Sequence, residues 1–345
     1  MLFYILSVFF INNSLGLTPI LLIPGFGGSV LTLNNNKIYP PSLNQILFNR
    51  NEWLNQIYID FNDIENKFNY NKNVKTLEFG NKKALDLDTN IPFFKKKNIY
   101  NKLINDYKNI YTIPYDFRLI HIPDYLNSFY LELTEYIEHF DRKISIIAHS
   151  TGGIILHYFL IQKTKKWKDK YIINVSYINV PFCGLTISLI EMIKNTYLNF
   201  VLNKKIIKSF GGLIINLPNN KYIKPILLVD GIEKNYIEYF NFTKINKIIN
   251  INYNFINSFN LKNDVSTNII YTSSIKTPVI IEINKKKVNI LYGNGDGIVS
   301  LKSILHPMIW NQHINYIHIP LYEHSNILYS NELKYIIFLL SYSDN

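Results

Sequence analysis

The 345-residue sequence contains one cysteine, Cys183, so no disulfide can form within the chain. Small secreted domains without a sufficient core depend on disulfides, but a chain of this length can bury a core large enough to do without them. We therefore expect one large α/β domain, or two modest ones, held together by packing. Cys183 is expected to be a small buried apolar side chain.

Acidic residues are also few: Asp and Glu number 25 against 36 Lys and Arg, which gives a formal net charge of +11. No nucleic-acid motif accompanies the lysines, which are scattered in short clusters among asparagine, isoleucine and tyrosine. We therefore expect no nucleic-acid partner. If the charge acts on a partner, attraction to an anionic membrane surface fits it better.

Long hydrophobic runs are missing as well. The apolar run Leu2–Ile11 is too short to span a bilayer, and small residues near Gly16 follow it. This pattern is typical of a signal peptide over residues 1–17, although the amino terminus is the only positive charge at its start. We expect a mature chain of residues 18–345, secreted or in the lumen of the secretory pathway. The alternative is a retained, membrane-associated leader.

What the sequence does contain is an alternation of short apolar runs with helix-like segments. This alternation predicts an α/β domain with a mostly parallel sheet. Two long stretches break the rhythm, and we expect a lid region at about 42–68 and a cap region at about 185–275. The runs predicted as buried parallel strands are 19–24, 143–148, 174–181, 288–292 and 315–320, and the predicted helices are 125–140 and 152–163.

The stretch SIIAHSTGGIIL places Ser150 between an apolar run and a helix-like segment. A nucleophile elbow needs this order, with small residues two before and two after the serine because strand and helix pack closely there. Gly152 meets the requirement, and Ala148 adds one methyl group where glycine is usual. Ser150 is therefore a candidate nucleophile. An ordinary turn serine is the alternative that this pentapeptide alone leaves open.

An acid and a base should then follow in the order serine, acid, histidine, in loops beyond the carboxyl ends of strands. His324 lies just past the last predicted strand, whereas His149 adjoins the serine and reads as structural. Asp296 follows the run 288–292 in a glycine-rich turn and is the candidate acid. Asp230, in ILLVDG, is its rival.

An oxyanion hole would complete such a site. The backbone N–H of Thr151, directly after the serine, is one expected donor. The second should come from the glycine-rich loop IPGFGGS after the first strand, where Phe26 is the best candidate. Four parts in the required order favour a serine nucleophile over a structural serine.

With these parts in place, the sequence resembles the lecithin:cholesterol acyltransferase family, which includes phospholipid:diacylglycerol acyltransferases and lysosomal phospholipase A2. The similarity covers about residues 18–340. It departs at Ala148, at Ile298 for a usual threonine, and at Phe117 and Phe182 for tryptophans. The similar blocks are TPILLIPGFGGSVL, NEWLNQIYIDFN, IPYDFRL, IAHSTGGIILHYFL, NVPFCG, SFGGLIINLP, YGNGDGIVS and HSNIL.

The resemblance implies an α/β-hydrolase fold with a catalytic Ser150, Asp296 and His324. It also implies that Trp53 lies on the lid near the acyl chain or the membrane, although a core position is the alternative. Asp116 and Arg118 would form a structural ion pair.

The activity implied is cleavage of a phospholipid ester through an acyl-serine, with transfer of the acyl group to water or to a sterol or other lipid alcohol. The enzyme would act at a membrane or lipoprotein surface and need no cofactor or metal. The alternatives are a general carboxylesterase or lipase, and a non-catalytic lipid-binding protein.

Overall fold

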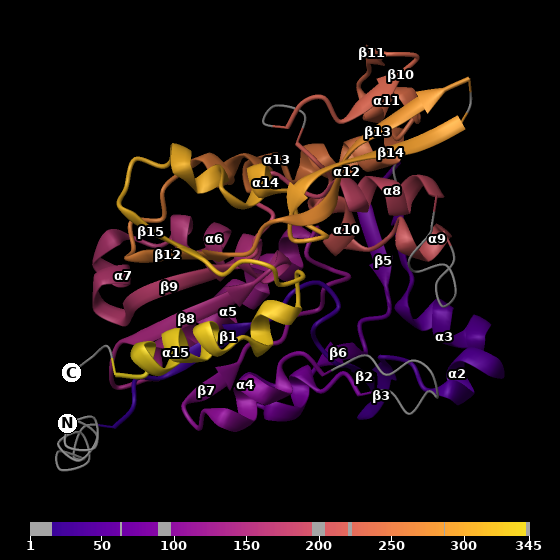
Figure 1. Cartoon of the computed structure of the whole chain (residues 1–345). Helices are drawn as coiled ribbons and strands as arrows, with labels where there is room; N and C mark the ends of the chain where they lie inside the picture. Colours follow the sequence, from indigo (N-terminus) through magenta and orange to yellow (C-terminus); the bar gives the residue numbers. More distant parts are fainter. Residues whose placement is uncertain are drawn as a thin grey trace.

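A parallel sheet of six strands forms the centre of the structure (Figure 1). The structure is a computed structural model, and it describes residues 16–62, 64–88, 98–194, 204–219, 223–285 and 287–342. All its neighbouring strands pair in parallel, so their carboxyl ends meet at one edge. The strand order across the sheet is β15 (Ile314–His318), β12 (Thr267–Tyr271), β9 (Ile172–Ile178), β8 (Ile144–His149), β1 (Ile20–Ile23) and β7 (Ile110–Thr112).

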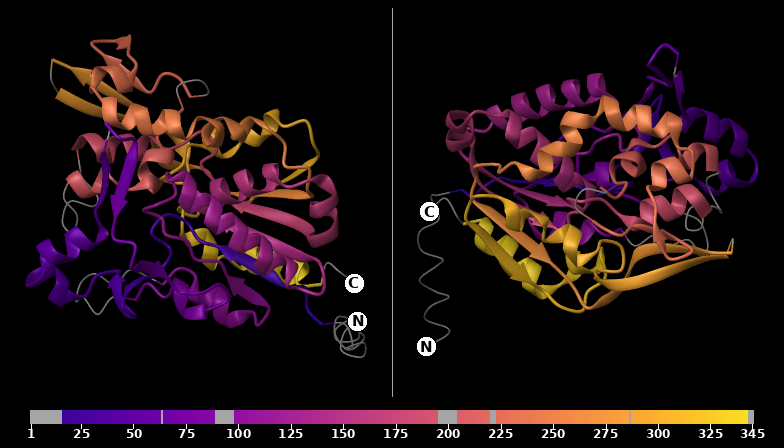
Figure 2. Two further views of the ribbon diagram at one scale, coloured as in Figure 1. Left: turned by 180° about the vertical axis from the view of Figure 1, so that it is seen from behind. Right: turned by 90° about the horizontal axis from the view of Figure 1, so that it is seen from above.

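Alternate residues of the strands enter two different cores, because side chains of a strand point to opposite faces. In β1, Leu21 and Ile23 pack in the core that contains α5 (Pro123–Glu138) and α6 (Thr151–Gln162). Ile20 and Leu22 pack in the core on the other face, with α4 (Asn101–Asp106) and α15 (Asn331–Leu340). Helices on both faces leave the strand ends as the place for a site (Figure 2).

The predicted lid region contains short helices and antiparallel strands. Its helices are α2 (Leu43–Leu47) and α3 (Arg50–Ile57), and β4 (Ile59–Asn62) pairs with β5 (Lys67–Tyr70). Next to this region in the chain, β3 (Asn36–Tyr39), β2 (Leu31–Leu33) and β6 (Val74–Thr76) form a separate three-stranded antiparallel sheet, and a 3₁₀ turn follows at Lys82–Leu85.

Trp53, on α3, is not at an exposed lid surface, and the expectation that it contacts the membrane is wrong. Its side chain is 1% exposed and belongs to the main core cluster. Its indole N–H donates to the carbonyl of Ile38 at 2.8 Å, so the polar edge is satisfied inside the protein. The large apolar ring of Trp53 is therefore stabilised by burial within the core.

Among the described residues, the predicted cap region holds six short helices and two strands of a second sheet, whose other two strands follow it in the chain. That sheet has the order β11 (Ile232–Glu233), β10 (Leu227–Val229), β13 (Ile275–Asn284) and β14 (Lys287–Gly295). The helices are α8 (Thr186–Lys194), α9 (Lys204–Ile207), α10 (Gly211–Ile215), α11 (Tyr236–Tyr239), α12 (Thr243–Ile251) and α13 (Tyr253–Asn257), followed by a 3₁₀ turn at Ser258–Asn260.

Two sequence predictions about this region need correction. The run 288–292 is not a buried parallel strand, because it lies in β14 and pairs antiparallel with β13 outside the central sheet. Conversely, Thr267–Tyr271 was assigned to the cap but is β12, which lies between β9 and β15 in the central sheet. Short apolar runs do not reveal which sheet they join, because pairing depends on distant partners.

The remaining described helices are α7 (Lys165–Tyr171), between α6 and β9 in the chain, and α14 (Leu301–Ile304), which is followed by 3₁₀ turns at His306–Ile309 and Asn326–Tyr329. Cys183 is buried and unpaired, as expected, and burial raises the pKa of its thiol to about 12. Within the described ranges, no helix has both the length and the apolar character needed to cross a membrane. The predicted signal peptide lies almost wholly outside the described residues.

Candidate active site

Ser150 occupies a sharp turn between β8 and α6. Its φ of 53° and ψ of −131° place a non-glycine residue in a region that L-residues rarely adopt. Close packing enforces the turn. A Cβ on Gly152 would lie 2.3 Å from the carbonyl oxygen of Pro24, and one on Gly25 would lie 2.9 Å from the Ser150 Cβ. The strand, strained serine and immediate helix have the geometry of a nucleophile elbow.

The structure brings Ser150, His324 and Asp296 together in one hydrogen-bonded chain. The Ser150 Oγ lies 2.9 Å from His324 Nε2, and His324 Nδ1 lies 2.6 Å from Asp296 Oδ2. His324 lies in the loop after β15, and Asp296 directly follows β14. Ser150 reaches the same edge of the central sheet from the end of β8.

The Asp296 carboxylate is buried and held by its own loop. Its Oδ1 accepts the backbone N–H groups of Ile298 at 2.8 Å and Val299 at 2.6 Å. The backbone N–H of His324 donates to the Asp296 carbonyl at 2.8 Å. With Oδ2 facing Nδ1, the hydrogen-bond network assigns the proton to Nδ1 and leaves Nε2 free to accept the serine proton.

The rival acid, Asp230, does not reach this site. It lies in the turn after β10 in the second sheet, and its carboxylate accepts the backbone N–H of Lys285 at 3.1 Å. His157 is also structural, because its ring stacks on Trp310 with the ring centroids 4.4 Å apart.

The two expected oxyanion donors flank Ser150. Thr151 is the first residue of α6, where the N–H groups have no intrahelical partner. Phe26 lies in a tight turn in which the N–H of Gly28 donates to the carbonyl of Gly25 at 2.9 Å. The turn needs φ = 66° at Gly27, which glycine adopts without strain.

These groups line a cavity of about 310 Å³. Its walls combine apolar side chains with polar groups, which include those at the serine and also Ser188 and Glu191 of α8. The apolar lining includes Leu87, Ile99, Leu185, Ile187, Leu213 and Ile298. Such a cavity suits an ester with a hydrocarbon chain.

A second hydrogen-bond chain, missed by sequence reasoning, runs behind the site through His149. The backbone N–H of Gly25 donates to the Tyr100 hydroxyl at 2.7 Å, and that hydroxyl lies 2.9 Å from His149 Nδ1. On the other side, His149 Nε2 lies 3.2 Å from the carbonyl oxygen of His324. The chain therefore ties the Phe26 turn to the backbone of the candidate base.

The environment of His149 fixes its proton. Burial, with a smaller contribution from the charge of His324, lowers the pKa of His149 to about 3. The ring therefore stays neutral, so Nε2–H donates to the His324 carbonyl and Nδ1 accepts the Tyr100 O–H. Its position next to Ser150 was visible in the sequence, but its partner Tyr100 was not.

Two further contacts support the site. The Nδ2 of Asn216 donates to the Thr151 hydroxyl at 2.8 Å, beside the expected oxyanion donor. Asp116 and Arg118 form the expected buried ion pair at 2.5 Å, and they do not touch the serine chain. The Arg118 carbonyl accepts the N–H of Gly211, which positions α10 against the cavity.

A family model and several known proteins are similar to this chain. The family model described as lecithin:cholesterol acyltransferase matches residues 93–209, which contain the elbow. The resemblance to the lecithin:cholesterol acyltransferase family is confirmed. Among curated proteins, the rabbit (Oryctolagus cuniculus) phosphatidylcholine-sterol acyltransferase is 25% identical over 196 residues, 48% of this chain and 44% of its own length.

Two other relatives extend the comparison. The bovine (Bos taurus) lysosomal phospholipase A and acyltransferase is 24% identical over 230 residues, 59% of this chain and 54% of its own length. The chicken (Gallus gallus) phosphatidylcholine-sterol acyltransferase is 29% identical over 91 residues, 25% of this chain and 22% of its own length. The matches thus span about half, or less, of these lecithin:cholesterol acyltransferase relatives.

Among solved structures, the Tle4–Tli4 complex contains a chain that superposes with a TM-score of 0.56 at 10% identity, covering 95% of this chain and 98% of that one. This likeness concerns the fold alone. With the parallel sheet, the elbow at β8 and the histidine loop after the last strand, the predicted α/β-hydrolase fold is confirmed.

Proposed function

We propose that this protein is a serine enzyme that cleaves a phospholipid acyl ester and passes the acyl group to water or to a lipid alcohol. The observation that carries the proposal is the hydrogen-bonded chain from Ser150 through His324 to Asp296 at an apolar cavity. The relatives named as acyltransferases and as a phospholipase A support the choice of a lipid ester.

The chemistry follows from the geometry. His324 Nε2 takes the hydroxyl proton as Ser150 Oγ bonds to the ester carbonyl carbon, and the buried Asp296 carboxylate stabilises the imidazolium. The Phe26 and Thr151 N–H groups stabilise the oxyanion. When the carbon–oxygen bond to the leaving alcohol breaks, His324 returns the proton to that alcohol. This leaves an acyl-serine.

In the second half, the acceptor hydroxyl gives its proton to His324 as its oxygen attacks the acyl-serine. Collapse of the second intermediate returns the proton to Ser150 Oγ and releases a fatty acid or a new ester. Water gives phospholipase A activity, and a sterol or another lipid alcohol gives O-acyltransferase activity. We propose that the enzyme acts peripherally at a lipid surface in the secretory pathway or outside the cell.

The test combines active-site labelling with product analysis. We expect a serine-directed fluorophosphonate to label the protein at Ser150. Vesicles of phosphatidylcholine and sterol should yield lysophospholipid with fatty acid or sterol ester. Ser150→Ala and His324→Ala should abolish turnover and keep the unfolding midpoint, since losing a triad member costs several powers of ten.

Three results would contradict the proposal in different ways. A folded protein that neither reacts with fluorophosphonate nor turns over lipid would indicate a non-catalytic lipid-binding protein. Equal turnover of dissolved short-chain esters and vesicles would indicate a general carboxylesterase. Full activity in Ser150→Ala would remove the serine mechanism itself.

A further inference from the structure

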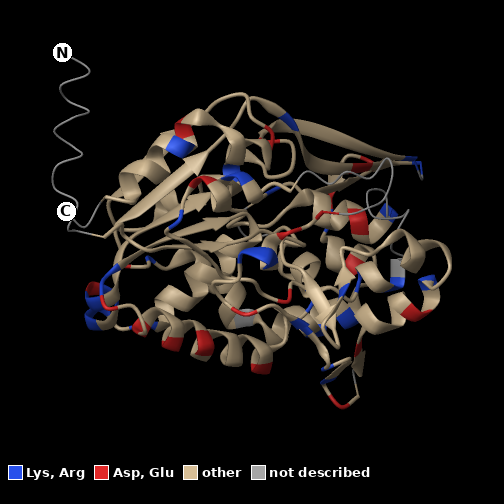
Figure 3. Ribbon diagram, turned by 90° about the horizontal axis from the view of Figure 1, so that it is seen from below, with Lys and Arg blue, Asp and Glu red and all other residues tan. Residues whose placement is uncertain are grey.

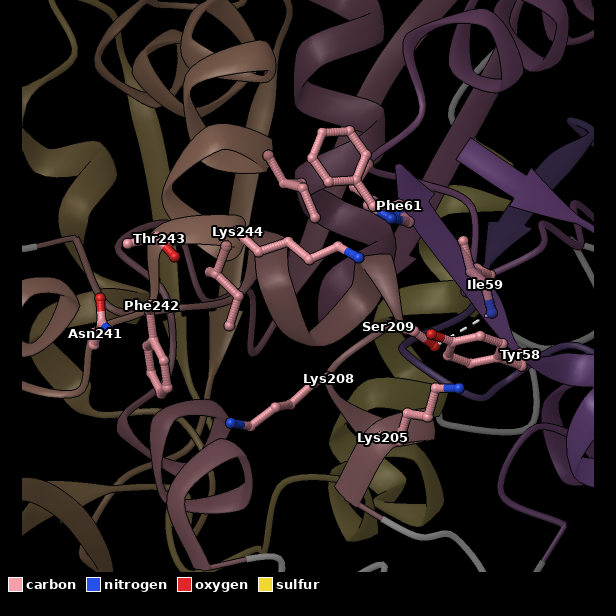
Figure 4. A pocket seen from close by; sticks show the side chains of 13 residues that line it. Tyr58, Ile59, Phe61, Lys205, Lys208, Ser209, Asn241, Phe242, Thr243 and Lys244 are labelled. Atoms are coloured by element: carbon pink, nitrogen blue, oxygen red, sulfur yellow. Dashed lines mark hydrogen bonds between the residues drawn. The ribbon is translucent and has the colours of Figure 1, made fainter. Parts of the chain in front are cut away.

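A second cavity, of about 330 Å³, lies between strand β4 of the lid region and helices α9 and α12 of the cap region (Figure 4). Lys205 of α9, Lys208 just after it and Lys244 of α12 extend into this region from different sides. None of its described lining residues is acidic. Figure 3 shows basic and acidic residues interspersed over most of the ribbon, so this concentration of lysine is a local feature.

Each lysine ammonium lies near an aromatic ring. The Nζ of Lys205 is 4.3 Å from the centre of the Tyr58 ring, and the Nζ of Lys208 is 4.9 Å from the centre of the Phe242 ring. Such contacts orient an ammonium without using its N–H groups. The cavity therefore combines hydrogen-bond donors with an apolar wall.

The third lysine has a carboxylate close by. Lys244 Nζ lies 3.5 Å from Asp60 Oδ1, and both side chains are about half exposed (48% and 49%). An exposed pair at this distance is weak and screened by salt. The described lining residues include three lysines and no carboxylate, so positive charge predominates among them. The first residues of α12 also line it, and the positive end of the helix dipole adds to that charge.

We propose that this cavity binds the phosphate of an anionic phospholipid, apart from the acyl ester that is cleaved. Ammonium groups suit phosphate oxygens, and the aromatic and isoleucine side chains suit the glycerol and the first methylenes of the chains. Lys205 and Lys208 line this cavity, whereas Gly212 and Leu213 line the catalytic one. One short segment therefore lies between the two cavities.

The proposal goes beyond the proposed function, because binding needs no turnover. The experiment uses full-length Ser150→Ala protein made in bacteria, so that lipid is not hydrolysed. Asn241, which lines the cavity and begins the glycosylation sequon Asn-Phe-Thr, then carries no glycan. Monomeric dihexanoylphosphatidic acid is titrated by calorimetry, with dihexanoylphosphatidylcholine and inorganic phosphate as separate titrants. We expect phosphatidic acid to bind more tightly than either of the other two, and more weakly as salt is raised.

Three variants decide the site. Replacing Lys205, Lys208 and Lys244 together by alanine should weaken phosphatidic acid binding by about tenfold or more, because charge-assisted hydrogen bonds are lost. The same three changes to arginine should retain binding and show that the fold tolerates substitution. A control with the same change in charge, Lys143, Lys166 and Lys170 to alanine, should bind as the parent protein does.

Several outcomes would overturn the proposal. Equal binding by the two alanine variants would mean that the lysines of this cavity are not the site. Equal binding of phosphatidylcholine would point to the acyl cavity, and equally tight binding of inorganic phosphate would remove the lipid from the proposal. None of these outcomes bears on whether Ser150 is a nucleophile.

Discussion

Asp296→Asn should reduce kcat by about 10³- to 10⁴-fold while leaving the fold intact. The reason lies in the two backbone N–H groups, of Ile298 and Val299, that donate to Oδ1. An asparagine must keep its carbonyl oxygen on those donors, so its NH₂ group faces His324. The ring nitrogen at 2.6 Å then has to accept a hydrogen bond, which moves the imidazole proton to Nε2. A protonated Nε2 cannot take the proton of Ser150.

The loss corresponds to about 4–5.5 kcal/mol of transition-state stabilisation. It should appear in kcat on a chromogenic ester and on phospholipid vesicles alike. Circular dichroism and urea unfolding should match the parent protein, because two of the three hydrogen bonds of the side chain survive. Asp230→Asn is the matched control and should keep full activity. Near-normal activity of Asp296→Asn, or a dead Asp230→Asn, would refute the assignment of the acid.

Three further predictions follow from buried groups. Tyr100→Phe should lower kcat about ten- to a hundredfold with little change in KM, because it removes the hydroxyl that links the Gly25 N–H to His149. Tyr107→Phe is the control and should be neutral, because the Tyr107 hydroxyl donates to the Lys334 carbonyl instead. Equal losses in both variants would argue against this link. Trp53→Ala should lower the free energy of unfolding in urea by about 3–5 kcal/mol, because the side chain is buried in the core. It should reduce activity on vesicles and on a dissolved ester by the same factor. A selective loss on vesicles would contradict the core position of Trp53. Finally, burial lowers the pKa values of His121 and His149 to about 3 and of His157 to about 4, so below pH 6.5 the unfolded chain binds protons that the folded one does not. The stability that these neutral histidines contribute should be present above pH 6.5 and fall by roughly 1 kcal/mol per histidine between pH 6.5 and 5.5. Urea midpoints that stay level over this range would count against this prediction.

The parts of the site that the sequence predicted are those encoded locally. The elbow at Ser150 is a strand, a turn and a helix in direct succession, and the Gly25–Gly28 turn is marked by its glycines. His324 could be placed because it follows a run that does become the last strand of the central sheet. Each of these features depends on residues close together in the chain.

The features that the sequence did not predict depend on distant partners. The structure places Asp296 beside His324, but the strand before it belongs to the second sheet and not to the central one. Tyr100 comes from 49 residues before His149, and no local pattern marks their contact. Trp53 illustrates the same limit, because an aromatic residue in a polar helix reads as exposed until its packing partners are known.

The hairpin of β13 and β14 connects the acid to a remote part of the molecule. Both of its ends lie at Asp296: Ile275, at the start of β13, bridges to it, and the N–H of Gly297 donates to Thr277 Oγ1 at 2.8 Å. The other end of the hairpin projects away from the central sheet with the rest of the second sheet (Figure 1). We expect an antibody or peptide that tilts this end to shift the Asp296 carboxylate relative to His324 without entering the cavity. Inhibition of that kind would be non-competitive with substrate.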